Sequence, residues 1–337
     1  MPSTIPILLH HVISRYRKRV RDGRTSRPAA FTNGPGRFMR RHLRTLGMII
    51  MVLACGTVAV LMNTGKLFPS QDKRHRTQQT EPGPTTSGAG QGGAYLPDVP
   101  MRLVWRDEFN GAAGTSPDPR RWKIETGSLG NGRLDYLTRR NVALDGKGHL
   151  VITARRQRAG KLPYTSARIT TEGRFEPTYG RITARIKTPN GRGLWPAFWM
   201  LGTNFRQLPW PDCGEIDIME RRGHLRDRVD ATLQGPGYAG VGLTRHYSLG
   251  PGGDFGAAFH TFTLDWRPNK ITLYVDNHVV QTARPSTLPG RWVFNHPFFI
   301  VLNLAIGGRY AGTPDAGTSF PAQMAVDYVR AYQTKPR

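Results

Sequence analysis

Three acidic residues, Glu215, Asp217 and Glu220, lie within a run of six and are separated by large apolar side chains. On a β-strand, successive side chains point to opposite faces, so Glu215 and Asp217 share a face while the isoleucines after them point into a core. Strict alternation would bury Glu220, where an unpaired carboxylate is costly. A β-bulge at Ile218 and Met219, which inserts one extra residue, returns Glu220 to the face of the other two acids.

Three carboxylates on one face can perform acid–base chemistry. Because they repel one another, at least one should hold a proton at neutral pH. A protonated carboxylic acid beside an ionised carboxylate is the pair that acts as general acid and nucleophile on a glycosidic bond. The alternative interpretation is a solvated strand face, on which alternating acids are common.

Three tryptophans precede this acidic segment. Trp195 and Trp199 lie in the apolar run that precedes it, and Trp210 follows them. Aromatic rings beside paired acids commonly form a platform for the apolar face of a sugar. Two of these rings could equally belong to the core.

The run from Gly193 to Glu220 resembles glycoside hydrolase family 16, in particular its bacterial endo-β-1,3-glucanase (laminarinase-like) branch. The family signature E-I-D-x-x-E is present at 215–220, in the bulged form with an extra methionine that is typical of this branch. The opening W-x-D-E-F of the family is matched at 105–109, and its closing V-D-Y-V-R-x-Y at 326–332. The resemblance covers roughly residues 103–332.

The resemblance implies retaining hydrolysis of internal bonds in a β-glucan, with no cofactor required. Glu215 would be the nucleophile, and Glu220 the general acid and base, its pKa raised by neighbouring negative charge. Asp217 would hydrogen-bond Glu215. The expected substrate contacts are Trp195, Trp199, Trp210, Asn131, Arg168 and Gln234. The activity expected first is that of an endo-β-1,3-glucanase, and a β-1,3/1,4-glucanase is the alternative for the linkage. Two alternative functions also remain: a non-catalytic β-glucan-binding module, and a wall-remodelling transglycosylase that uses the same residues.

Two departures from the family pattern concern the cleft. Arg133 follows Asn131 at a position where the family often has an acid, which alters the sugar contacts expected there. Gln234 replaces a histidine, so this side chain can donate and accept hydrogen bonds but cannot titrate near pH 7. Arg168 could be a charge partner within the cleft or part of a structural ion pair.

Many members of the family hold a structural calcium ion on the convex side of the fold. The corresponding positions here are Glu108, Gly148 and Asp327. A hard cation requires several oxygen ligands, among which backbone carbonyl groups count. Asp327 could equally pair with one of the many arginines, so the sequence leaves both interpretations open.

From Met101 onward, short alternating segments rich in β-branched and aromatic residues recur between turns that contain Gly, Pro and Asn. The clearest are residues 150–154, 180–187, 260–266, 271–276 and 298–304, and 274–280 is typical of a hairpin. Many strands with almost no helical periodicity predict an all-β, two-sheet sandwich. The resemblance sharpens this to a β-jelly roll (concanavalin A-like) whose concave sheet forms the sugar-binding cleft.

The chain is strongly basic, with 48 Lys or Arg against 23 Asp or Glu among 337 residues and a formal net charge of +25. This excess favours anionic surroundings such as lipid headgroups or acidic wall polymers. Nucleic acid is not expected as a partner, because no binding motif for it is recognisable. Cys55 and Cys213 occupy different settings, which supports neither a disulfide framework nor a Cys-based metal site.

The N-terminal third predicts a bacterial protein exported and held at the membrane. Residues 1–45 are basic and are expected to be disordered or to lie against anionic lipid. Residues 46–62 carry no charge and predict a transmembrane signal-anchor, oriented by the preceding arginines so that the rest is exported. A cleaved signal, a lipoprotein box ending at Cys55 and a start at Met39 are alternatives. Residues 63–100 form a flexible linker, and 101–337 the catalytic domain, expected to be monomeric.

Overall fold

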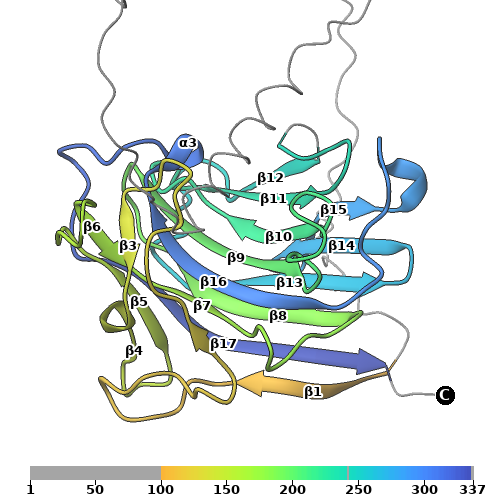
Figure 1. The fold of residues 1–337 in the computed structure, drawn as a ribbon, viewed down its shortest axis with the longest axis horizontal. Coiled ribbons are helices and arrows are strands. Elements are labelled where there is room, and N and C mark those ends of the chain that lie inside the picture. Colours follow the sequence, from red (N-terminus) through yellow and green to blue (C-terminus); the bar gives the residue numbers. More distant parts are fainter. Residues whose placement is uncertain (1–99, 241–242, 335–337) are drawn as a thin grey trace, which may run out of the picture. The chain divides into compact units, whose positions relative to one another are not determined.

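The computed structural model describes residues 100–240 and 243–334, which form two large antiparallel sheets packed face to face (Figure 1). The basic segment 1–45, the apolar segment 46–62, with Cys55, and the linker up to residue 99 lie outside the described residues. Among the helices that the structure does describe, none is long and apolar enough to span a bilayer.

The first sheet, here called the site sheet, has seven strands. In spatial order they are β12 (Thr244–Ser248), β11 (Arg228–Gln234), β10 (Glu215–Glu220), β9 (Leu194–Gly202), β16 (Phe298–Ile306), β7 (Arg168–Thr170) and β2 (Lys123–Ile124). The acidic segment is therefore an inner strand, held on both sides by neighbours that fix its register.

The second sheet, here called the backing sheet, has eight strands. Its order is β15 (His278–Ala283), β14 (Lys270–Val275), β13 (His260–Arg267), β8 (Gly180–Lys187), β17 (Ala322–Thr334), β5 (Leu150–Ala154) and β4 (Val142–Leu144), and β1 (Met101–Asp107) also pairs with β17. The remaining elements are short: a parallel pair of β3 (Asp135–Leu137) and β6 (Tyr164–Ser166), two 3-10 turns, η1 (Arg139–Asn141) and η2 (Pro285–Thr287), and the helix α3 (Gly308–Ala311).

The core lies between the two sheets. β16, nine residues long, is buried throughout. Phe198 and Ile216 from the site sheet join Ile182 and Leu264 from the backing sheet in one apolar cluster, each with no exposed surface. Each such side chain contributes about 1.5–3 kcal/mol on burial, so this interface holds the sandwich together.

The predicted all-β sandwich is confirmed, and the five clearest predicted strands are all present. β5 and β8 have the predicted bounds, and β13, β14 and β16 differ from them by one or two residues. The predicted hairpin is β14–β15. Its two loop residues, Asp276 and Asn277, have φ values of 46° and 69°, the left-handed conformation that suits a tight two-residue turn.

The predicted bulge in β10 is also confirmed. Asp217 pairs with Trp199 of β9, but Met219 already pairs with Phe198, so two steps along β10 match one step along β9. Met219 is buried in the apolar cluster as Ile218 is. The extra residue therefore turns both apolar side chains inward, and Glu220 resumes the outward face.

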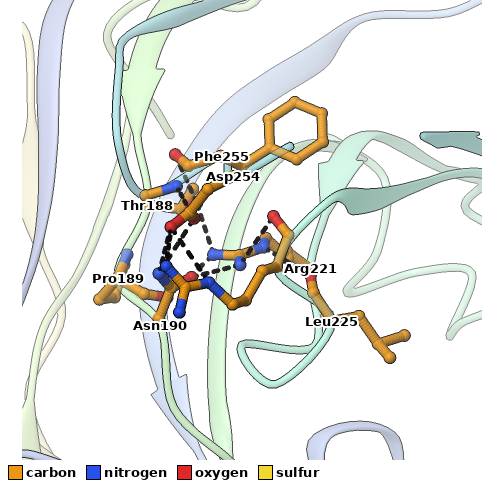
Figure 2. A network of polar contacts seen from close by, with 9 residues as sticks. Thr188, Pro189, Asn190, Arg221, Leu225, Asp254 and Phe255 are labelled. Carbon is orange, nitrogen blue, oxygen red and sulfur yellow. Dashed lines mark hydrogen bonds and ion pairs between the residues drawn. The ribbon is translucent and has the colours of Figure 1, made fainter. Parts of the chain in front are cut away.

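Arg221 anchors the end of β10, directly after Glu220 (Figure 2). Its side chain is fully buried. All five of its N–H groups donate, to the carbonyl oxygens of Leu225, Pro189 and Arg226 and to the side chains of Thr188 and Asn190. Burial lowers the pKa of Arg221 to about 10, and the nearby carboxylate of Asp254 opposes this. The guanidinium is therefore still charged at neutral pH, and it ties the strand end to two loop segments, 188–190 and 225–226.

Replacing Arg221 with Met should destabilise the protein by about 3 kcal/mol or more, because it leaves buried acceptors without donors. Urea denaturation of the wild type and the variant measures this difference. Arg291→Met is the matched control: Arg291 forms an exposed ion pair with Asp212 at 2.9 Å, and exposed pairs contribute only about 0–1 kcal/mol. Equal losses in the two variants would contradict an anchoring role for Arg221.

Candidate active site

The structure brings the three predicted acids together on the outward face of the site sheet. Glu215 and Glu220 pair with residues of β11, Gln234 and Asp230 respectively. Asp217 pairs with Trp199 of β9. Directly opposed residues on neighbouring strands point to the same face. Glu215 and Asp217 are also within hydrogen-bonding distance of each other. The bulge thus collects all three carboxyl groups on one surface.

Glu220 keeps its proton near neutral pH. Burial, and then the negative charge of Glu215, raises the pKa of Glu220 to about 8. The indole N–H of Trp195 donates to Glu220 Oε1 at 2.8 Å and opposes this rise. The predicted direction of the pKa shift agrees, but its largest cause is burial, and the neighbouring negative charges come second.

Glu215 and Asp217 are hydrogen-bonded to each other, and Glu215 loses its proton more readily than Asp217 does. Burial raises the pKa of Glu215 to about 7, while the charge of Arg168 and a hydrogen bond from Asp217 lower it. Burial, the charges of both glutamates and the hydrogen bond to Glu215 hold the pKa of Asp217 well above its usual range. Asp217 therefore stays protonated and donates to Glu215, which ionises first.

The three predicted tryptophans differ in their relation to the acids. Trp195 contacts Glu220 directly, and its ring packs on Tyr310 at 4.9 Å between centroids. Trp199 donates to Asn303 Oδ1 at 2.8 Å. Trp210 lies in the loop between β9 and β10 and is 50% exposed. Trp195 and Trp199 thus belong to the face that carries the acids, whereas Trp210 offers an open ring beside the strands.

Arg168 realises both of the alternatives expected for it. It forms an ion pair with Glu125 at 3.1 Å, and its guanidinium lies over the ring of Trp199 at 4.7 Å. Its positive charge also lowers the pKa of Glu215. Arg168 is thus a structural ion-pair partner whose charge also favours an ionised Glu215.

Both polar atoms of the Gln234 side-chain amide form hydrogen bonds within the protein. Its Nε2 donates to Asp217 Oδ2 at 3.4 Å, and its Oε1 accepts the backbone N–H of Gly240 at 2.8 Å. Gln234 therefore orients Asp217 through a long hydrogen bond, and its contact with a substrate stays a prediction.

Asn131 and Arg133 lie in the loop before β3. Asn131 is exposed with a left-handed φ of 56°. Arg133 forms a two-point contact with the buried carboxylate of Asp135, at 3.0 and 2.6 Å. The unusual arginine is therefore neutralised by the first residue of β3, and Asn131 is an exposed polar side chain of the loop.

Four residues near the acids escaped the sequence analysis: Glu125, Asn303, Asp230 and Tyr310. Asp230 lies on the neighbouring strand β11, and the other three come from parts of the chain distant in the sequence; none belongs to a motif. The cross-strand register, which pairs Asp230 with Glu220, could have revealed Asp230.

The residues expected to hold calcium do not fit a calcium ion. Glu108 makes a two-point contact with Arg330 at 2.8 and 2.7 Å, and Asp327 pairs with Arg185 at 2.6 Å. Gly148 occupies a turn with a φ of 85°. Each carboxylate is already neutralised by a guanidinium, so the ion-pair interpretation of Asp327 is correct. Within the described ranges, no cluster of three or more His, Cys, Asp or Glu could hold a metal.

Comparison with known proteins places these observations in a family. A β-glucanase of Rhodothermus marinus is 36% identical over 249 residues, covering 68% of this chain and 85% of that protein. The crystal structure of an endo-β-1,3-glucanase from Pyrococcus furiosus is 43% identical and aligns over 72% of this chain and all of that one, with a TM-score of 0.67.

A laminarinase catalytic domain from Thermotoga petrophila RKU-1 is 42% identical, covers 71% of this chain and all of that chain, and also has a TM-score of 0.67. The model of glycosyl hydrolases family 16 matches residues 132–330, more than half of the chain. The acidic bulged strand, the sandwich and these relatives agree: the chain belongs to glycoside hydrolase family 16.

Proposed function

We propose that this protein is an endo-β-1,3-glucanase that hydrolyses internal bonds of a β-glucan with retention of configuration. The observation that carries the proposal is the unequal ionisation of the carboxyl groups that the bulge gathers. Glu220 keeps a proton to about pH 8, whereas Glu215 loses its proton at about pH 7. A proton donor and an ionised carboxylate are then available together.

Glu215 is the nucleophile in this proposal. Its carboxylate bonds to the anomeric carbon as the glycosidic C–O bond breaks, and a glycosyl-enzyme ester forms. The hydrogen bond that Asp217 donates stabilises the negative charge of Glu215 before attack. The positive charge of the nearby Arg168 also favours the ionised form of Glu215. Asp217 is thereby a positioning residue for the nucleophile.

Glu220 is the general acid and then the general base. Its proton goes to the departing glycosidic oxygen in the first step. In the second step its carboxylate takes a proton from water, and that water attacks the anomeric carbon and breaks the ester to Glu215. The Trp195 N–H holds one oxygen of Glu220, which leaves the other to exchange the proton.

The proposed substrate is a β-1,3-linked glucan chain lying across the site sheet. The relatives named above are a β-glucanase and two β-1,3-glucanases, and they support this choice. One row of residues crosses from β7 to β12 through Glu220. Six strands spaced at about 4.8 Å make a surface about 24 Å wide, room for several sugar residues. The rings of Trp195 and Trp210 would stack on their apolar faces.

Incubation with laminarin should release short oligosaccharides early, before glucose, because an endo-acting site cuts within the chain. Chromatography of products over time, with and without an added oligosaccharide acceptor, distinguishes the three candidate activities. Shorter chains alone indicate hydrolysis, transferred chains indicate a transglycosylase, and binding without cleavage indicates a β-glucan-binding module. Either of the last two outcomes would contradict the proposal.

The variants Glu215→Gln and Glu220→Gln assign the chemistry in the same assay. Each should lower kcat/KM by about 10³-fold, since general acid–base catalysis alone contributes roughly 10²–10⁴-fold. An aryl β-glucoside whose leaving group needs no proton should restore bond cleavage in Glu220→Gln but not in Glu215→Gln. Glu176→Gln, on an exposed loop, is the control and should match the wild type.

The pH dependence of kcat/KM should be bell-shaped, with a maximum between about pH 7 and 8. Below the pKa of Glu215, about 7, the nucleophile is protonated and activity falls. Above the pKa of Glu220, about 8, the acid has lost its proton and activity falls again. The two limbs belong to the coupled group rather than to single residues. Initial rates in buffers of constant ionic strength test this, and activity still rising at about pH 9 would exclude Glu220 as the acid.

We also propose that the catalytic domain acts outside the cell as a single copy, tethered by the uncharged segment 46–62. The arginines before that segment and the polar linker after it support this topology. The full chain, expressed in a bacterium, should fractionate with membranes and be open to protease added outside, whereas a chain lacking residues 1–62 should stay in the cytoplasm. Protection of the full-length chain from external protease would refute export.

A further inference from the structure

We infer that Asp230 and Tyr310 form a positioning unit that holds the general acid Glu220 from two sides. The inference rests on the proposed function for the role of Glu220 and deepens it. Neither residue belongs to the acidic motif: Asp230 lies on β11, and Tyr310 lies in the helix α3, 90 residues after Glu220 in the chain.

The unit is a closed ring of contacts around the acid. Glu220 Oε1 accepts the N–H of Trp195 at 2.8 Å, and the Trp195 ring packs on Tyr310 at 4.9 Å. The Tyr310 hydroxyl donates to Asp230 Oδ2 at 2.7 Å. Asp230 is the direct cross-strand neighbour of Glu220, so the backbone pairing of β10 with β11 completes the ring. Each member is thus fixed by the next, and Glu220 has little freedom to leave its position.

Asp230 is built into the sheet as a charged group. It is 2% exposed. Its Oδ1 accepts from His246 Nδ1 at 2.6 Å and from Arg228 Nε at 3.2 Å, and Arg222 lies 3.6 Å from Oδ2. A buried carboxylate is tolerated only with such partners. An apolar residue at position 230 would need none of these charged partners, so the cluster points to a role for the negative charge of Asp230 itself.

The charge of Asp230 acts on Glu220 against that of Arg222. Asp230 raises the pKa of Glu220, and the guanidinium of Arg222 lowers it. The other groups facing Asp230 are Arg228 of its own strand, His246 of β12 and the hydroxyl of Tyr310. Burial and the neighbouring acids hold the pKa of Tyr310 far above its usual range, so this hydroxyl remains a donor at every working pH. The opposing charges of Asp230 and Arg222 therefore adjust the pKa of Glu220.

Opposite shifts in the pH profile test this balance. Asp230→Asn removes the anion and should move the alkaline limb of kcat/KM to lower pH by about one pH unit. Arg222→Met removes the opposing cation and should move the limb to higher pH. Arg222 is partly exposed, with 34% of its side chain accessible, so this variant keeps the test open if Asp230→Asn fails to fold.

Tyr310→Phe tests positioning separately from charge. It keeps the ring against Trp195 and removes only the hydrogen bond to Asp230. We expect kcat to fall about fivefold, the rate equivalent of one hydrogen bond, with KM and the alkaline limb unchanged.

Asp265→Asn is the matched control for Asp230→Asn. Asp265 is likewise buried and paired with two arginines, Arg181 and Arg267, but it lies on β13 of the backing sheet. It should leave the pH profile unchanged. The same limb shift in this variant would overturn the inference, because the effect would then be a general loss of negative charge.

A substrate-free measurement separates this inference from the proposed function. Carbon-13 NMR of the full chain labelled at glutamate carboxyl groups follows the ionisation of Glu220, identified by the signal missing in Glu220→Gln. This titration should move to lower pH in Asp230→Asn even if no β-glucan is cleaved, in which case only the proposed function fails. An unchanged titration of Glu220 in both Asp230→Asn and Arg222→Met overturns the inference whatever the activity.

Discussion

One inserted residue in β10 governs the chemistry of this protein. A regular strand would send Glu220 toward the core with Ile216 and Ile218, and the outward face would carry two acids instead of three. The bulge after Asp217 instead buries Ile218 and Met219 together and returns Glu220 to the surface. The fold has to stabilise this irregularity, and it does so with β9 and β11 on the two sides and the buried Arg221 at the end.

The site also shows how burial and charge divide the work of tuning acids. All three carboxyl groups lie close together, yet burial is the largest influence on each. What distinguishes them is the partner that each one meets: Arg168 favours the ionised form of Glu215, Asp217 lies almost without access to water, and Glu220 faces another anion across the strand. Distinct roles thus arise from one short segment because its residues face different strands.

Features encoded within a few consecutive residues could be predicted from the sequence. The alternation in residues 180–187, the Asp276–Asn277 turn and the bulge at Ile218–Met219 all follow from local spacing, and the structure has them where they were expected. Long-range pairings could not be predicted in this way. Nothing near Asp327 in the chain indicates its ion pair with Arg185, and nothing near Glu220 indicates Tyr310, because only the tertiary fold brings these residues close.

The burial of the acids has a consequence for the endurance of the fold. Glu215 and Glu220 have ordinary pKa values of 4.5 when unfolded and values of about 7 and 8 here, so the native chain binds more protons than the unfolded chain between those limits. The stabilisation that these two groups contribute is fully present below about pH 4.5. It is lost as the pH rises from there through the folded-state pKa values of about 7 and 8. The pH range in which Glu215 is ionised while Glu220 is protonated is therefore one in which most of this stabilisation has already been lost. The apolar core between the site sheet and the backing sheet contributes stability that does not depend on the ionisation of these carboxyl groups.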